Sequence, residues 1–152
     1  MLIRLSLLNF GLMAGFFYAY SVTVMPGLDD SAPETAVAAM QGINRVVRNP
    51  VFFATFFGGA FLPLLAGVVA YMRGQWVSAG LIGVAGVAYL LGVVVFTAQI
   101  HVPMNDALAQ ITAPASSSVW ANYAPDWTFW NHVRGGICLA CLALSAEALR
   151  RA

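Results

Sequence analysis

The sequence predicts an all-α integral membrane protein: a four-helix bundle with short amphipathic helices capping its outer side. Three observations support this fold class. Of the 152 residues, 61% are hydrophobic and only 9% are charged, whereas about a quarter of the residues of a soluble domain are charged. Four apolar runs are each near the roughly 20 residues that cross a bilayer. Polar side chains gather at one end of these runs, the end that we take as outer.

The four apolar runs define the spans of a single membrane domain, residues 1–152. They cover Leu5–Met25, Val51–Met72, Trp76–Ile100 and Thr128–Leu149. In lipid the backbone must satisfy its own hydrogen bonds, so each run is expected to be a helix. The first run is longer than the apolar core of a signal peptide, about 7–15 residues, and no clear cleavage site follows it. We therefore interpret it as a retained span.

The connection between the first two spans predicts a short cap helix over about residues 33–48. Ser31 followed by Glu34 three residues later has the pattern of a capping box. An apolar stripe follows at helical spacing, formed by Val37, Met40, Ile43 and Val47. A polar stripe accompanies it, formed by Gln41, Asn44, Arg45 and Arg48. Asn49-Pro50 is expected to end this helix and open the second span.

The connection between the third and fourth spans predicts a second cap helix over about residues 105–111. Pro103 is expected to break the third span just after His101, and Asn105 can cap the short helix that follows. Residues 113–118 are small and predict a loop. Pro125-Asp126 suits the first turn of the fourth helix, where no N–H is needed and an acid meets the helix dipole.

The distribution of arginines predicts that both termini are cytoplasmic, as in a bacterial-type cytoplasmic membrane. With that orientation, the short inner loop and tails hold Arg4, Arg73, Arg150 and Arg151. The net charge of +1 gives no basic surface for nucleic acid. Gly11, Gly15 and Ala19 form a small-residue face that serves either the bundle or a homo-oligomer.

Polar residues of the fourth span point to a pocket in the outer half of the bundle. Trp127, Asn131 and Arg134 follow i, i+4, i+7 and share one helix face, with Thr128 and His132 on an adjacent face. Ionisable groups within spans usually face a bundle interior or a cavity. The plainer alternatives are a snorkelling arginine, a structural histidine, and an interfacial belt of Trp120, Trp127 and Trp130.

Two histidines leave a metal or haem site open as an alternative. His101 and His132 end oppositely directed spans at the same depth, and Met25 and Met104 lie there too. Two histidines with a methionine can ligate copper, and two histidines from different helices can hold haem. No zinc spacing supports them. Cys138 and Cys141 lie within one apolar run and are interpreted as packing residues.

Several motifs together resemble the anthrone-oxygenase-like family of small membrane proteins. They are YSVTVMPGL at 20–28, MQGINRVVRNPVF at 40–52, HVPMND at 101–106 and WANYAPDWTFWNHVR at 120–134. The resemblance implies a four-helix membrane fold. It also implies oxidation of an anthrone or hydroquinone-like aromatic substrate by O₂, without a cofactor, as by a monooxygenase. The family usually carries Asn where this chain has His101, which leaves His132 as the family histidine.

The resemblance suggests roles for the residues of the predicted pocket. His132 would act as the base, since imidazole exchanges protons near neutral pH. Arg134, Asn131 and Asn105 would stabilise the resulting oxyanion. The substrate would be held by Trp127, Trp130, Asn44 and Tyr20, and as a small apolar molecule it would reach the pocket through the lipid bilayer.

Two alternatives to an enzyme of this kind remain. One is a membrane haem- or copper-binding protein ligated by His132, with or without His101. The other is a non-enzymatic membrane carrier or assembly subunit, in which the polar cluster only ties the cap to the bundle.

Overall fold

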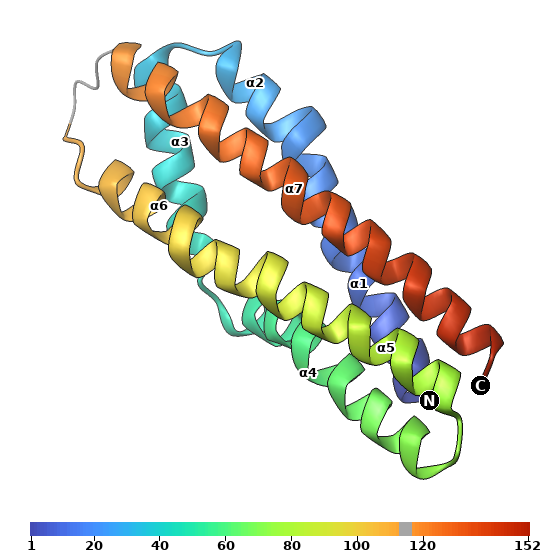
Figure 1. Cartoon of the computed structure of the whole chain (residues 1–152). Coiled ribbons are helices and arrows are strands. Elements are labelled where there is room, and N and C mark those ends of the chain that lie inside the picture. Colours follow the sequence, from blue (N-terminus) through green and yellow to red (C-terminus); the bar gives the residue numbers. More distant parts are fainter. Residues whose placement is uncertain (113–116) are drawn as a thin grey trace.

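The structure is a computed structural model that describes residues 1–112 and 117–152, and its regular elements are all helices. Four rods lie side by side (Figure 1). The first rod comprises α1 (Leu2–Ala19), η1 (Tyr20–Val24) and α2 (Met25–Asp29). The second is α4 (Pro50–Met72). The third comprises α5 (Trp76–Tyr89), η2 (Leu90–Val95), η3 (Thr97–His101) and α6 (Val102–Ala109). The fourth is α7 (Ser117–Arg150), and the separate helix α3 (Pro33–Val46) joins the first two rods.

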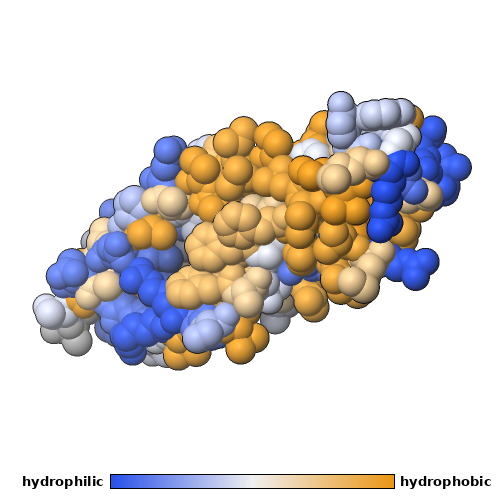
Figure 2. Space-filling model, turned by 90° about the horizontal axis from the view of Figure 1, so that it is seen from below, coloured by the Kyte–Doolittle hydropathy of each residue, from blue (hydrophilic) through white to orange (hydrophobic). Residues whose placement is uncertain are grey.

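Each of the four rods is long and apolar enough to cross a membrane, which confirms the predicted four-span fold. Both chain termini lie at one end of the bundle, here called the terminal end, and α2, α3 and α6 lie at the other, the cap end (Figure 1). Figure 2 shows apolar side chains over the middle of the visible face and hydrophilic ones at its two ends. Large apolar side chains point outward from the rods, among them Leu8, Leu12, Phe61, Val68, Leu91 and Leu139. Such a surface suits lipid.

An aromatic layer fills the middle of the bundle, formed by Phe10, Phe56 and Tyr89. The ring centroids of Phe10 and Tyr89 are 5.4 Å apart, and those of Phe56 and Tyr89 are 6.4 Å apart. The Tyr89 ring fits because Gly59 of α4 has no side chain: a Cβ there would lie 2.4 Å from the ring. At Gly15, by contrast, a Cβ would meet nothing within 4 Å. The bundle therefore uses Gly59 for close packing and leaves the Gly15 position open.

Helix α3 closes the cap end, although its N-terminus differs from the prediction. The capping-box prediction is wrong: Ala32 is the N-cap, without a side-chain hydrogen bond, and the Ser31 hydroxyl donates to the Leu28 carbonyl at 2.7 Å. Pro33 suits the first helical position, which moves the cap to Ala32. The predicted apolar stripe is borne out, since Val37 and Met40 are buried in the cap core. That core also contains Met25, Ala36, Leu108, Trp120, Tyr123, Ala124 and Trp127.

Polar residues of α3 and of the turn that follows it fasten α3 to the third rod. The Gln41 amide donates to the carbonyls of Leu108 and Ile111 at 2.9 and 3.0 Å, where α6 ends. Arg48 pairs with Asp106 at 2.7 Å. Asn49 caps α4 by accepting from the Phe52 N–H at 3.0 Å, as predicted.

The helix breaks predicted at the second connection are wrong. The third rod continues through Pro103 to Ala109, because the hydrogen-bond register changes from η3 to α6 just before the proline and an altered ladder accommodates its missing N–H. Asn105 therefore lies inside a helix rather than capping one. Pro125 also lies inside α7, which begins at Ser117, eight residues before it. Residues 113–116 of the predicted loop lie outside the described residues.

Replacing Gly59 by Ala is expected to lower the free energy of unfolding by about 1–3 kcal/mol, since the buried Tyr89 ring must shift to admit a methyl group. Thermal unfolding of the detergent-purified protein measures the change. Gly15→Ala is the matched control, and it should not destabilise the bundle, because alanine favours helix and meets no neighbour. Equal melting temperatures for the two variants would contradict this packing.

Candidate functional site

A cavity of about 260 Å³ lies in the cap half of the bundle, between the rods and α3. A large part of its wall is aromatic and is formed by Phe16, Phe17, Tyr20, Phe52, Phe53, Phe56, Phe57 and Trp127. Polar side chains come from α3, from η3 and α6, from α7, and from Arg48 just after α3, which is paired with Asp106. Three lining side chains at its edge are partly exposed, namely Phe53 and Phe57 of α4 and Val102 of α6, at 42%, 41% and 38%. The cavity thus opens sideways between α4 and the third rod.

Arg134 is the most unusual residue of this wall. Its side chain is 5% exposed, and no carboxylate among the described residues pairs with it. The guanidinium donates to the Thr97 hydroxyl at 3.0 Å and to the Asn131 carbonyl oxygen at 2.9 Å. It lies over the Phe17 ring, 4.5 Å from the centroid. The Nε–H has no partner, so one donor of a buried cation is left unused beside the cavity.

Asn131 holds this arginine in place. Its side chain is fully buried, and its amide donates at 2.8 Å both to the Phe17 carbonyl and to the Ser21 hydroxyl. These two acceptors flank the point where α1 gives way to η1. Because its oxygen accepts from Arg134, one amide joins the first rod, the fourth rod and the cation. Asn131 is fully hydrogen-bonded and does not line the cavity.

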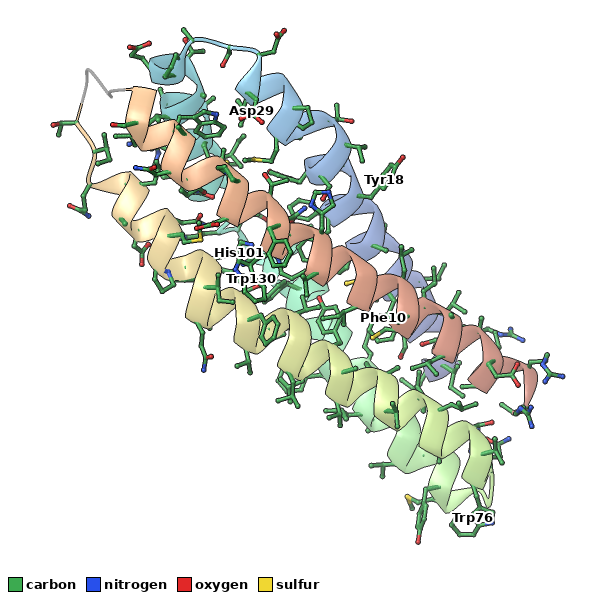
Figure 3. All side chains as sticks on the ribbon, turned by 45° about the horizontal axis from the view of Figure 1, so that its top comes forward. Phe10, Tyr18, Asp29, Trp76, His101 and Trp130 are labelled. Carbon is green, nitrogen blue, oxygen red and sulfur yellow. The ribbon has the colours of Figure 1, made fainter. Side chains whose placement is uncertain are left out.

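His101 contributes an imidazole to the same cavity. It is 1% exposed, and neither ring nitrogen has a hydrogen-bond partner. Its ring meets the Trp127 ring edge-on, with centroids 5.3 Å apart. Figure 3 shows His101 in the interior between the rods, whereas Tyr18 and Trp76 project outward. Buried polar atoms normally find partners, so both nitrogens are available to a molecule in the cavity.

Four further predicted site residues also line this cavity. Asn44 is buried with an unpartnered amide nitrogen, and Tyr20 packs on Trp127 with centroids 5.7 Å apart. Asn105 accepts from the Tyr123 hydroxyl at 2.7 Å and from the Trp127 indole at 3.1 Å. Its oxygen is therefore already used to orient two aromatic side chains.

His132 and Trp130 lie elsewhere. His132 is exposed and its Nδ1 contacts the Thr128 carbonyl at 2.7 Å. It lines a separate groove with Asp29, Trp120 and Phe129. Trp130 packs edge-on against Phe96, with centroids 5.6 Å apart. Neither residue lines the aromatic cavity, because each points from a different side of α7 than Trp127 and Arg134.

The structure does not bring the two histidines together. His101 faces the aromatic cavity and His132 faces the groove. Met25 is buried in the cap core, with Met104 packed against it. In the part of the chain that the structure describes, no three His, Cys, Asp or Glu side chains gather as a metal site would need. Cys138 and Cys141 are buried free thiols in the core.

Sequence reasoning missed two features of the site. The first is the set of π-helical segments, η1, η2 and η3, of which η3 carries Thr97 and His101; such segments are frequent at functional sites. The spacing of Thr97 and His101, one helical turn apart, was an available signal. The second is the α4 wall. The pairs Phe52-Phe53 and Phe56-Phe57 repeat at helical spacing, which would have indicated an aromatic face.

The arrangement suits a flat, electron-rich aromatic molecule. Aromatic walls provide stacking and edge-to-face contacts. Arg134 offers a positive charge that pairs with no carboxylate among the described residues, and the low-dielectric surroundings strengthen its attraction for an anion. His101 can accept or return a proton next to that charge. The site can therefore bind a weakly acidic aromatic and stabilise the anion formed from it.

Comparison with known proteins identifies a family. The family model described as anthrone oxygenase matches residues 51–144. This region covers α4, the whole third rod and most of α7, and so includes His101, Trp127 and Arg134. A search of curated proteins and a search of solved structures found no match.

Replacing Asn131 by Ala is expected to lower the free energy of unfolding by about 3 kcal/mol, because the buried Phe17 carbonyl and the buried Arg134 guanidinium each lose one hydrogen-bond partner. Chemical or thermal unfolding in detergent measures the loss. Asn122→Ala is the control on the same helix: Asn122 is exposed, so its replacement should change stability by no more than about 0.5 kcal/mol. If both variants unfolded like the parent, Asn131 would not hold the rods together.

Proposed function

Since the chain belongs to the anthrone oxygenase family, we propose that it is a membrane-embedded oxygenase. Its substrate would be a small, weakly acidic aromatic compound, anthrone- or hydroquinone-like, oxidised by O₂ in the aromatic cavity. The observation that carries this proposal is the buried Arg134 guanidinium, which lacks a carboxylate partner among the described residues and borders the cavity. A buried cation of this kind is costly, and an anionic substrate would compensate it.

The proposed chemistry balances without a further reductant. His101 removes a proton from the activated CH₂ group of an anthrone, leaving a delocalised enolate whose oxygen is stabilised by Arg134. The enolate transfers one electron to O₂, and the resulting radicals combine to form a C–O bond. The hydroperoxide then loses water: its remaining C–H proton and its terminal OH group leave together, and the carbon becomes a ketone. One oxygen atom ends in the quinone and the other in water.

His101 takes the role of base because of its position. The resemblance to the family favours His132, but that ring lies in the outer groove beside Asp29. A base must come within hydrogen-bond reach of the proton that it removes. His101 lines the same cavity as Arg134, and both of its nitrogens are free. Asn131, Thr97 and Asn105 then act as positioning residues for the cation and for Trp127.

The sideways opening supports access from the lipid. Phe53, Phe57 and Val102 are partly exposed on the flank of the bundle, where an apolar molecule dissolved in the bilayer would meet them. The cavity volume of about 260 Å³ lies just below the usual range for small-molecule sites, roughly 300–1,000 Å³. A compact substrate is therefore favoured over an extended lipid.

Replacing His101 by Asn is expected to slow oxidation of anthrone at least about 100-fold, since general-base catalysis contributes roughly 10²–10⁴-fold. O₂ uptake by the protein in nanodiscs, corrected for spontaneous oxidation, measures the rate. His132→Asn is the matched control and should stay within about threefold of the parent rate.

The same pair of variants can contradict the assignment. Loss of activity in His132→Asn with activity kept in His101→Asn would move the reaction to the outer groove. Full activity in both variants would exclude histidine as the base, even if the protein is an oxygenase.

Replacing Arg134 by Met is expected to lower turnover by about 10²–10³-fold, the usual effect of removing an oxyanion donor. The free energy of unfolding should stay the same or rise, because an apolar side chain often replaces a buried charge without loss. Parallel O₂-uptake and melting measurements test both statements. Arg45→Met, at an exposed position of α3, is the control. A fall in stability that matches the fall in activity would indicate a structural role for Arg134.

A further inference from the structure

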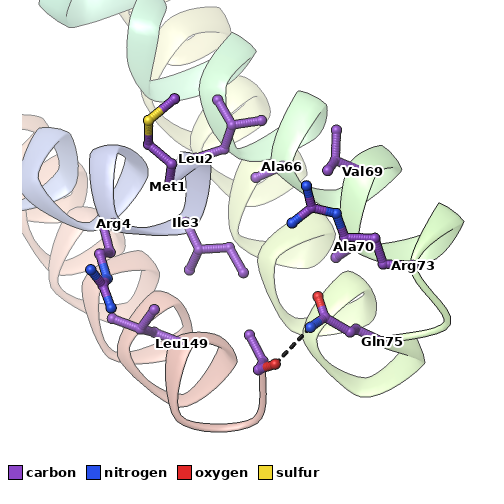
Figure 4. Close-up of a pocket in the computed structure, with 11 residues that line it drawn as sticks. Met1, Leu2, Ile3, Arg4, Ala66, Val69, Ala70, Arg73, Gln75 and Leu149 are labelled. Carbon is purple, nitrogen blue, oxygen red and sulfur yellow. Dashed lines mark hydrogen bonds between the residues drawn. The ribbon is translucent and has the colours of Figure 1, made fainter.

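A second cavity, of about 620 Å³, lies at the terminal end of the bundle. Its floor and walls are apolar and come from α1, α4 and α7, with Ile3, Ala66, Val69 and Leu149 among them (Figure 4). Gln75 closes one side by donating to the main-chain oxygen of Ala152 at 2.6 Å. The proposed oxygenase site lies on the other side of the aromatic layer, so this cavity belongs to no part of that chemistry.

The charges around this cavity are unbalanced. The terminal end carries four arginines, Arg4, Arg73, Arg150 and Arg151. Glu147 accepts hydrogen bonds from Arg150 at 2.8 and 2.7 Å and also from Arg151. No hydrogen bond or ion pair joins the side chain of Arg4 or Arg73 to another described residue. Figure 4 shows these two side chains on opposite sides of the cavity, with Ile3 between them.

We propose that this cavity binds an anionic phospholipid. The headgroup phosphate would bridge Arg4 and Arg73, and the start of an acyl chain would follow the wall formed by Ile3, Ala66 and Val69. Guanidinium groups hold phosphate oxygens through paired, charge-assisted hydrogen bonds. Basic pockets between transmembrane helices are recurrent sites for acidic lipid headgroups.

The geometry favours an amphiphile over a soluble anion. α1 begins and α4 ends at this level, so in a bilayer the arginines would lie near the level of the lipid phosphates. A free phosphate ion would use the two cations but would leave the apolar wall in contact with water. A lipid satisfies both, because its charge meets the arginines while its chain covers the apolar residues.

The test is native mass spectrometry of the delipidated protein in neutral detergent, titrated with phosphatidylglycerol or with phosphatidylcholine. One phosphatidylglycerol is expected to bind in preference to phosphatidylcholine. Arg4→Gln and Arg73→Gln should each weaken that binding by roughly fivefold, the effect expected for one arginine near an acidic headgroup. Arg151→Gln removes the same charge from the same end and should leave binding unchanged. Arg73→Lys, which keeps the charge, should retain most of it.

Three results would overturn the proposal. Equal binding of the two lipids would show that no anionic headgroup is recognised. Equal weakening by Arg151→Gln would reduce the effect to overall surface charge. Displacement of the lipid by inorganic phosphate at matching concentration would assign the cavity to a soluble anion. Melting temperatures measured without added lipid confirm that each variant is folded, and neither lipid titration depends on oxygenase activity.

Discussion

The placement of one guanidinium inside an apolar bundle governs the architecture of the cap half. Lipid chains offer a buried arginine no hydrogen-bond acceptors, so the protein itself must supply them. The bundle provides Asn131 from the same helix, Thr97 from the third rod, and the face of Phe17 from the first. Three rods therefore converge on Arg134. The unpartnered Nε–H of Arg134 and the cavity beside it are what remain for a ligand.

The π-helical segments show how the backbone meets this requirement. η1 lies next to the acceptors that Asn131 uses, and η3 carries both Thr97 and His101. A wider turn shifts the side chains that follow it around the helix axis. In the third rod, His101 of η3 is buried beside the cavity. The irregular stretches thus coincide with the site, while the terminal halves of the rods stay regular α-helix.

Much of this architecture follows from the sequence, because spans and amphipathic stripes depend on hydrophobic periodicity, which is local. The four spans, the α3 helix and the shared face of Trp127, Asn131 and Arg134 all emerge in this way. The sequence does not predict which way His132 faces. Adjacent helical residues point about 100° apart, and only packing against the other rods decides which side of α7 faces the cavity. The helix break predicted at Pro103 is wrong for a related reason. A register change in the hydrogen-bond ladder leaves no pattern in the sequence that would reveal it. Residue types mark the polar cluster, but tertiary contacts select its inward members.

The aromatic layer of Phe10, Phe56 and Tyr89 has an electrical consequence. It crosses the bundle between the cap-half cavity and the terminal end, and its one polar atom, the Tyr89 hydroxyl, has no hydrogen-bond partner. Protons need a chain of donors and acceptors to move, and this layer interrupts any such chain. Under the proposed mechanism, protons taken up or released at His101 would therefore return to the side from which they came. Turnover in the cavity would then move no net charge across the bilayer and would leave the membrane potential unchanged. The protein would neither pump protons nor conduct them.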